Sequence, residues 1–314
     1  MGAEKLRDLG GVHGSLEEAL QDPEVGPYLI WGTLLLVPIA LVSIFMLRLL
    51  LRALKGGPLE PPRWEWPEVL LAFLLWIFFD FSTKAVLDLL DLLLALPPEV
   101  PPPVPLLASW ALTPFREGVL LAGIAGSRLL AVGLLLGVPV VRGQSLGALG
   151  IGNAPPGRGA FQGLVTYLVC IPGVFVVSIG WAILIAAFGH GGEAQQTVER
   201  FLGAVRAGHT TVICLFFFVA VVGAPLLEEI LFRAITFRWL ARRLGTGMGV
   251  LLSSLIFGLV HLNLAAFLPV TLLGAILALL YHRTGNLWSP VALHGAYNLC
   301  QLLWLMAMAS TQQG

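Results

Sequence analysis

Three short motifs in the second half of the chain place acidic, basic, imidazole and amide side chains within apolar sequence. They are EEILFR at 228–233, FGLVH at 257–261 and HGAYN at 294–298. In each motif two polar or aromatic residues stand four apart, a spacing that brings them to one face of a helix. Ionisable residues in apolar helices are costly and usually functional, so these motifs define the candidate site.

The first motif contains two adjacent carboxylates whose surroundings differ. Glu229 and Arg233 lie four residues apart and can pair, so we expect Glu229 to stay ionised. Glu228 is turned about 100° away and has no cation three or four residues from it within its own helix. We predict that Glu228 is the general base, since a carboxylate beside a histidine can take a proton from water.

The other two motifs supply two histidines and an amide. Phe257 precedes His261 by four residues, and Asn298 follows His294 by four. At 1.5 Å of rise per residue, Glu228 and both histidines fall at overlapping depths in a bilayer, so one shared site is geometrically feasible. An amide donor aimed at a developing oxyanion stabilises it by about 3–4 kcal/mol in a dry site.

These motifs resemble EExxxR, FxxxH and HxxxN of the CPBP intramembrane proteases, also called the Abi or CAAX-protease family. That family includes the type II CAAX prenyl endopeptidases, and the resemblance covers about residues 160–308. It implies a peptide hydrolase in which the first Glu and the first His activate water, while the second His and the Asn serve the substrate carbonyl. The catalytic residues would be Glu228, His261, His294 and Asn298, with Glu229, Arg233 and Phe257 supporting them.

The resemblance leaves the metal question open, because the family is labelled both metalloprotease and metal-free glutamate protease. If zinc is present, its ligands would be Glu228, His261 and His294, which are residue types that zinc accepts. The sequence lacks HExxH, and no carboxylate follows Glu229, so the outer support of a ligating His looks thin. We therefore expect no metal cofactor, with zinc as the alternative.

The elements that carry these motifs must be membrane helices. Of the 314 residues, 57% are hydrophobic and 11% charged, against about 25% charged in soluble domains. The mean hydropathy is +0.89. The composition predicts an all-α fold, a polytopic membrane bundle of about eight transmembrane helices. A net charge of zero without a basic patch excludes a nucleic-acid partner.

Eight apolar segments are candidate spans, at about 28–51, 68–95, 117–141, 160–188, 211–240, 247–263, 264–281 and 288–308. A polar segment at 189–209 holds an amphipathic helix expected on the membrane surface. The chain then divides into an acidic extramembrane tail (1–27), N-terminal helices with a Pro-rich loop at 96–105 (28–116), a catalytic core (117–308) and a short tail (309–314).

Basic residues predict the orientation in the membrane. Ten Lys and Arg fall on one side of the predicted bundle and five on the other, which predicts that both termini lie outside the cytoplasm. We expect no cleavable signal peptide. The expected location is the bacterial cytoplasmic membrane. The expected partners are the lipid bilayer and a membrane-embedded or lipidated peptide or protein substrate. Whether that substrate carries a prenyl group is left open.

A second polar set lies within 68–95, where Asp80, Lys84, Asp88 and Asp91 form one helical stripe. We interpret it as a stripe buried against other helices, with Arg128 as a partner, and a proton or ion pathway is the alternative reading. An ion- or proton-coupled carrier is therefore a second function class, although we find no internal repeat of the kind that transporters show. A non-catalytic immunity or scaffold protein is a third.

The segment GQSLG at 143–147 fits the pattern of a nucleophile elbow. That pattern needs a strand before the serine and a helix after it. Here the segment sits in a Gly-rich loop after a membrane helix, so we reject Ser145 as a nucleophile.

Overall fold

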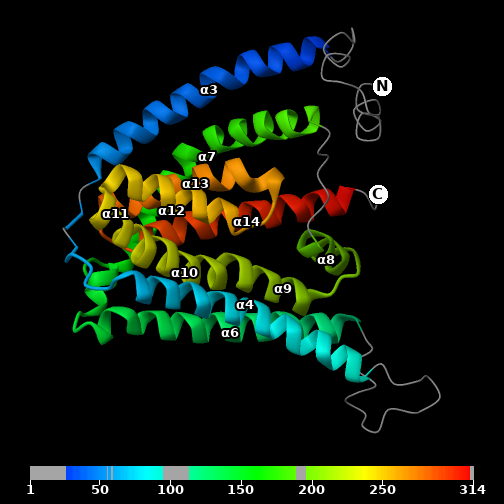
Figure 1. The fold of residues 1–314 in the computed structure, drawn as a ribbon. Helices are drawn as coiled ribbons and strands as arrows, with labels where there is room; N and C mark the ends of the chain where they lie inside the picture. The colour runs from blue at the N-terminus through cyan, green and yellow to red at the C-terminus, as the bar shows by residue number, and fades with distance from the viewer. Residues whose placement is uncertain (1–25, 55, 58, 95–112, 189–195, 312–314) are drawn as a thin grey trace.

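The computed structural model describes residues 26–54, 56–57, 59–94, 113–188 and 196–311 (Figure 1). Within these ranges every regular element is helical and no strand occurs, so the prediction of an all-α membrane bundle is confirmed. The predicted tails and the Pro-rich loop at 96–105 fall wholly or mostly outside the described residues, as do the side chains of Lys84, Asp88 and Asp91.

The elements run in the chain order shown in Figure 1. The long helices are α3 Gly26–Ala53, α4 Trp66–Leu94, α6 Thr113–Val141, α7 Pro156–Ala187, α13 Leu264–Thr284 and α14 Trp288–Thr311. The shorter ones are η1 Leu146–Leu149, α8 Gln196–Arg206 and α12 Thr246–Leu259. A continuous helical rod, the central rod, joins α9 Thr210–Phe218, η2 Val219–Gly223, α10 Ala224–Glu228, η3 Glu229–Phe237 and α11 Arg238–Leu244.

Six of the described helices are long and apolar enough to cross a membrane, where eight spans were expected. The expected span 247–263 is wrong in length, because α12 ends at Leu259. Its 14 residues cover about 21 Å at 1.5 Å each, less than the hydrocarbon core of about 30 Å. Leu262 has a positive φ of 48°, which no α-helix accommodates, and Asn263 then caps α13 by accepting from the N–H of Ala266 at 3.1 Å.

The central rod was expected as one α-helix and contains two π-helical stretches, η2 and η3. Pro225 follows η2 and has no N–H, so the regular bond to the carbonyl of Val221 cannot form. That carbonyl faces α14 at Gly295, where a Cβ would come within 2.7 Å of it. π-helical stretches are common at functional sites, and here Glu228 lies between the two while Glu229 begins the second.

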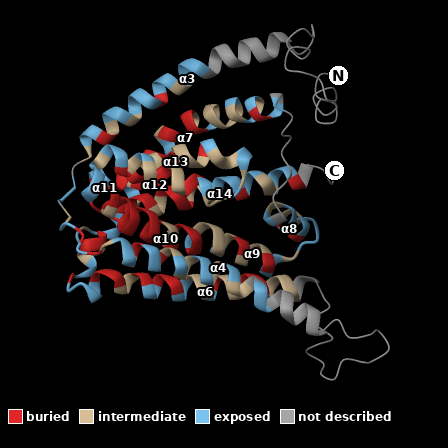
Figure 2. Cartoon of the chain, in the orientation of Figure 1, coloured by how far each residue is buried: buried red, intermediate tan, exposed pale blue. Residues whose placement is uncertain are grey.

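The core of the bundle is built around η3, all nine residues of which are buried (Figure 2). Phe232 packs edge-on against Phe73 of α4 and Phe257 of α12, with ring centroids 5.6 and 5.0 Å away. By contrast α3 lies along the outside of the bundle against α7 and exposes most of its described side chains (Figure 2). The candidate site residues on η3 therefore sit in the best-packed part of the molecule.

The amphipathic helix expected at 189–209 is α8. Its apolar face was expected to meet the membrane surface. Instead Phe201 and Ala204 are buried with α9 and α14 residues, and the Phe201 ring lies 5.4 Å from that of Phe216. The face packs on the bundle because α9 follows after a short turn and brings its own aromatic residues alongside.

The segment between α3 and α4, which we call the strap (described residues 56–57 and 59–65), crosses one end of the bundle. Trp64 is fully buried and its Nε1–H donates to the carbonyl of Ile235 in η3 at 3.1 Å. Arg238 donates to the carbonyls of Glu60 and Ala148 and lies 5.5 Å over the Trp64 ring. The strap and the loop around η1 are thus tied to the central rod.

Candidate functional site

A chain of three buried polar residues links α14 to η3. His294 Nδ1 lies 2.8 Å from Glu229 Oε1, and Arg233 Nε lies 3.0 Å from Glu229 Oε2. Glu229 and Arg233 have no exposed side-chain surface, and the ion pair expected between them is present. A carboxylate accepts, so His294 donates through Nδ1, which leaves Nε2 as its second functional atom.

Phe257 completes this buried group. The Cζ of Arg233 lies 4.2 Å from the centre of the Phe257 ring, and Nη1 and Nη2 of Arg233 have no hydrogen-bond partner among the described residues. A cation over an aromatic face is attracted by the ring quadrupole. The same ring lies 4.9 Å from that of His261 and 5.8 Å from that of His294, so Phe257 brings the three motifs together.

Glu228 differs from its neighbour, as the sequence predicts. Its Oε2 lies 4.0 Å from His294 Nε2, its side chain is 13% exposed, and this oxygen has no hydrogen-bond partner among the described residues. A separation of 4.0 Å is too long for a direct hydrogen bond and is short enough for one water to contact both groups. Glu228 is therefore the carboxylate of the pair that is left for chemistry.

His261 does not lie on a helix, contrary to expectation, but in the turn after α12. Its Nδ1 is 2.7 Å from the carbonyl oxygen of Phe257. A carbonyl only accepts, so the ring donates through Nδ1, and a neutral ring keeps its lone pair at Nε2. The turn thus fixes the orientation of the His261 ring and leaves Nε2 as its second functional atom.

A cavity of about 370 Å³ collects His261, His294 and Asn298, and Phe257 forms part of its wall. Asn298 Nδ2 donates to the carbonyl of Ala220 in η2 at 2.8 Å. That bond uses one of the two N–H groups of the amide and leaves the other. Glu228 is not among the lining residues and reaches the site through its approach to His294.

Four further polar residues line this cavity, and sequence reasoning missed them. They are Ser178, Asn263, Tyr297 and Gln301. Gln301 follows His294 by seven residues and Asn298 by three, so helical spacing alone placed it on their face. Ser178 comes from α7 and carries no signal that the sequence could have shown.

The three possible zinc ligands do not form a metal-binding group. The described part of the chain holds no cluster of three or more His, Cys, Asp or Glu placed to bind a metal ion. The expectation of thin outer support was wrong for His294, which Glu229 itself holds, whereas His261 is held by a backbone carbonyl. The two rings are oriented as metal-bound rings are, but the ligands do not converge, so we derive no step through a metal.

Two other sequence features have structural roles in the described residues. Gln144 of GQSLG is buried, accepts from the N–H of Arg63 at 2.9 Å and donates to the carbonyl of Pro61 at 3.0 Å, so this segment anchors the strap. Asp80 accepts from Arg128 at 3.3 Å, the partner predicted for the stripe on 68–95.

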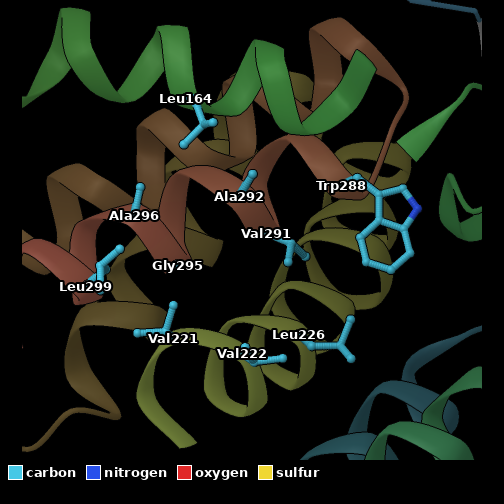
Figure 3. Close-up of a pocket in the computed structure, with 10 residues that line it drawn as sticks. All are labelled: Leu164, Val221, Val222, Leu226, Trp288, Val291, Ala292, Gly295, Ala296 and Leu299. Atoms are coloured by element: carbon cyan, nitrogen blue, oxygen red, sulfur yellow. The ribbon is translucent and has the colours of Figure 1, made fainter. Parts of the chain in front are cut away.

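An apolar cavity of about 280 Å³ lies between α7, the central rod and α14 (Figure 3). Leu164, Val222 and Ala292 come from its three walls, and none of its lining residues is ionisable. It shares α14 with the site through Gly295 and Ala296, the two residues after His294. It can accommodate an apolar group but supplies no reactive one.

Comparison with known proteins relates the chain to a family model and to a curated relative. Residues 210–300 match a family model described as type II CAAX prenyl endopeptidase Rce1-like. The Bacillus subtilis protein named "Putative membrane peptidase YdiL" is 34% identical over 134 residues, which are 41% of this chain and 52% of that relative. The chain thus spans about half the length of the curated relative it matches. No solved structure matches the present chain.

Proposed function

We propose that this integral membrane protein is an intramembrane endopeptidase, because residues 210–300 match the Rce1-like model and include EEILFR, FGLVH and HGAYN, which resemble the motifs of the CPBP, or CAAX-protease, family. It hydrolyses a peptide bond of a membrane-associated substrate with water activated by Glu228 and His261. One observation carries the proposal. His261, His294 and Asn298 line a single cavity, and Glu228 stands 4.0 Å from His294 at its edge.

In this proposal Glu228 accepts a proton from the attacking water as its oxygen adds to the substrate carbonyl carbon. The lone pair at His261 Nε2 accepts a hydrogen bond from the other O–H of that water and orients the water for attack. When the tetrahedral intermediate collapses, the C–N bond breaks and Glu228 returns its proton to the leaving nitrogen. General base catalysis of this kind contributes about 10²–10⁴-fold.

His294 and Asn298 then face the developing oxyanion. Glu228, Glu229 and Arg233 carry formal charges that sum to −1 − 1 + 1 = −1, and a protonated His294 brings the sum to zero. His294 Nδ1 already donates to Glu229, so donation from Nε2 to the oxyanion needs a ring that carries both protons, and that form compensates the buried charges. It donates through Nε2 to the oxyanion beside the second N–H of Asn298.

The substrate is proposed to be a membrane-embedded or lipidated peptide. The apolar cavity in Figure 3 supports this, since it shares α14 with the polar one and suits an apolar side chain or lipid. The proposed location is the bacterial cytoplasmic membrane with both termini on its outer side. The start of α3 and the end of α14 lie at the same end of the bundle (Figure 1), as that orientation requires.

We propose that catalysis needs no metal cofactor. Purified protein should keep its activity in excess chelator and contain well under one zinc per chain by elemental analysis. Stoichiometric zinc, with activity lost on chelation and regained on adding zinc, would overturn the proposal and make Glu228 and the two histidines ligands.

The central experiment compares membranes from cells that express the parent, Glu228→Gln or Glu199→Gln. Glu199 is an exposed carboxylate on α8 and serves as the matched control. We expect mass spectrometry of peptide termini to show cleavage products with the parent and with Glu199→Gln, reduced about 10²–10⁴-fold with Glu228→Gln at equal folded yield. If no product depends on Glu228, the carrier and the non-catalytic protein become the better assignments.

A further inference from the structure

A second polar cavity, which we call the end cavity, lies outside the proposed catalytic site and has a volume of about 510 Å³. It is bounded by the strap, by α11 and α12, and by the C-terminal end of α13. Three of its lining side chains carry or can carry positive charge, namely Arg238, Arg242 and His282, and none of its lining residues is acidic. Its lining is therefore suited to an anion.

The position of the end cavity relative to the membrane favours an anion that lies at the bilayer surface. The apolar span of α4 begins at Trp66, and those of the central rod and α13 end at Leu244 and Thr284. The strap crosses over these ends, where the N–H of Gly56 donates to the carbonyl of Arg283 at 2.9 Å. The apolar part of the bundle stops at this level, which is where the phosphates of a bilayer lie.

The charges around the end cavity do not cancel. Arg242 and Arg243 share the single carboxylate of Glu65, and Arg238 has the carboxylate of Glu60 nearby. Glu65 is thus shared between two cations, and neither Glu65 nor Glu60 lines the end cavity, whereas Arg238 and Arg242 do. The bonds from Arg238 go to neutral carbonyls, so an entering anion has charge left to neutralise.

The floor of the end cavity is apolar. Leu59, Phe237 and Ala241 line it beside the cationic side chains. A free phosphate compound gains little from such a floor, whereas the glycerol and first acyl carbons of a phospholipid would cover it. Basic pockets between membrane helices are a known setting for anionic headgroups.

We propose that the end cavity binds the phosphate of an anionic phospholipid headgroup, with Arg242 and His282 as its donors. Phe237, which forms part of the floor, is the last residue of η3. A lipid in this cavity therefore contacts the element that carries Glu229 and Arg233 and stabilises it.

The test measures binding of phosphatidylglycerol to the full-length purified chain in mixed detergent micelles, by native mass spectrometry and by the rise in Tm, with phosphatidylcholine as reference. Arg242→Gln and His282→Gln should each weaken the phosphatidylglycerol effect, by about tenfold for Arg242→Gln, the usual scale for loss of a charge-assisted hydrogen bond. Arg243→Gln is the matched control, because Arg243 pairs with the same Glu65 and does not line the cavity.

Three results would overturn the proposal. The parent could bind both lipids equally, Arg243→Gln could lose as much as Arg242→Gln, or soluble glycerol 3-phosphate could stabilise the parent as well as the lipid does. The first result would show that the negative charge of the lipid does not matter. The second would show that general surface charge accounts for the effect, and the third would show that the site binds a free phosphate compound. His282 makes no ion pair in the described residues, so its variant separates loss of binding from loss of the pairing with Glu65.

Discussion

Two Glu–Arg pairs in this protein show what burial does to the same chemistry. Glu229 and Arg233 meet at 3.0 Å in the middle of the bundle with no exposed side-chain surface. Glu65 meets Arg242 and Arg243 at the end of the bundle, where the three side chains are 34%, 32% and 55% exposed. Water can solvate a partner that is left alone at the exposed pair and cannot reach one at the buried pair.

This difference in burial explains how many neighbouring residues must contact each charged pair. Glu229 also holds His294, and Arg233 also lies against Phe257, so the buried pair is closed by neighbours on α12 and α14. The exposed pair needs only the strap and α11. The buried Glu229 carboxylate needs partners within the protein, and its contact with His294 fixes the orientation of that ring. The stability of the core and the geometry of the proposed site therefore depend on the same contacts.

The largest effect should come from breaking the buried pair. Arg233→Ala leaves the Glu229 carboxylate without its cation in a site closed to water. We expect a loss of about 3–5 kcal/mol in stability and a sharp fall in folded yield, measured by thermal unfolding in detergent and by monodisperse recovery.

A double variant checks the reason for that loss. In Glu229→Gln with Arg233→Met both charges are gone, so the variant should recover part of the stability that Arg233→Ala loses, while His294 loses its anionic partner and activity stays low. If the double variant is no more stable than Arg233→Ala, an unpaired charge is not what destabilises the single variant.

A smaller effect should follow from removing the ring that covers Arg233. Phe257→Leu keeps an apolar residue but removes the cation–π contact, which contributes about 0.5–2 kcal/mol. Phe201→Leu is the matched control, since Phe201 is equally buried in another cluster and none of the cation–π contacts of the described residues involves its ring. Thermal unfolding should show a larger fall in Tm for Phe257→Leu. Equal falls would mean that Phe257 acts through packing alone.

Local spacing was enough to predict part of this arrangement. The Glu229–Arg233 pair lies within one helical rod, and a partner for Asp80 was identifiable because Arg128 is the one cation in the predicted span 117–141. The all-helical membrane bundle followed from composition, because a chain with so few charges has no other stable surface.

The remaining features depend on contacts between distant segments. Glu229 and His294 are 65 residues apart, so their bond exists only once α14 packs on η3. The π-helical η2 depends on Pro225 and on the close approach of Gly295, and the early end of α12 depends on a positive φ at Leu262. The periodicity of the sequence does not report on contacts between distant segments, and the role of Glu229 as the support of His294 was missed for that reason.

The smallest effect should come from the exposed pair. Hydrogen bonds from Arg243 and Arg242 lower the pKa of Glu65 from its ordinary 4.5 to about 2. A carboxyl whose pKa is lower in the folded state stabilises the fold above pH 4.5, and this contribution is lost as the pH falls towards 2. Because water and salt screen the pair, Glu65→Gln should change Tm little at pH 7. Any difference from the parent should shrink at pH 3 and in high salt. A fall in Tm at pH 7 as large as that of Arg233→Ala, or a difference that grows on acidification, would show that exposure does not separate the two pairs.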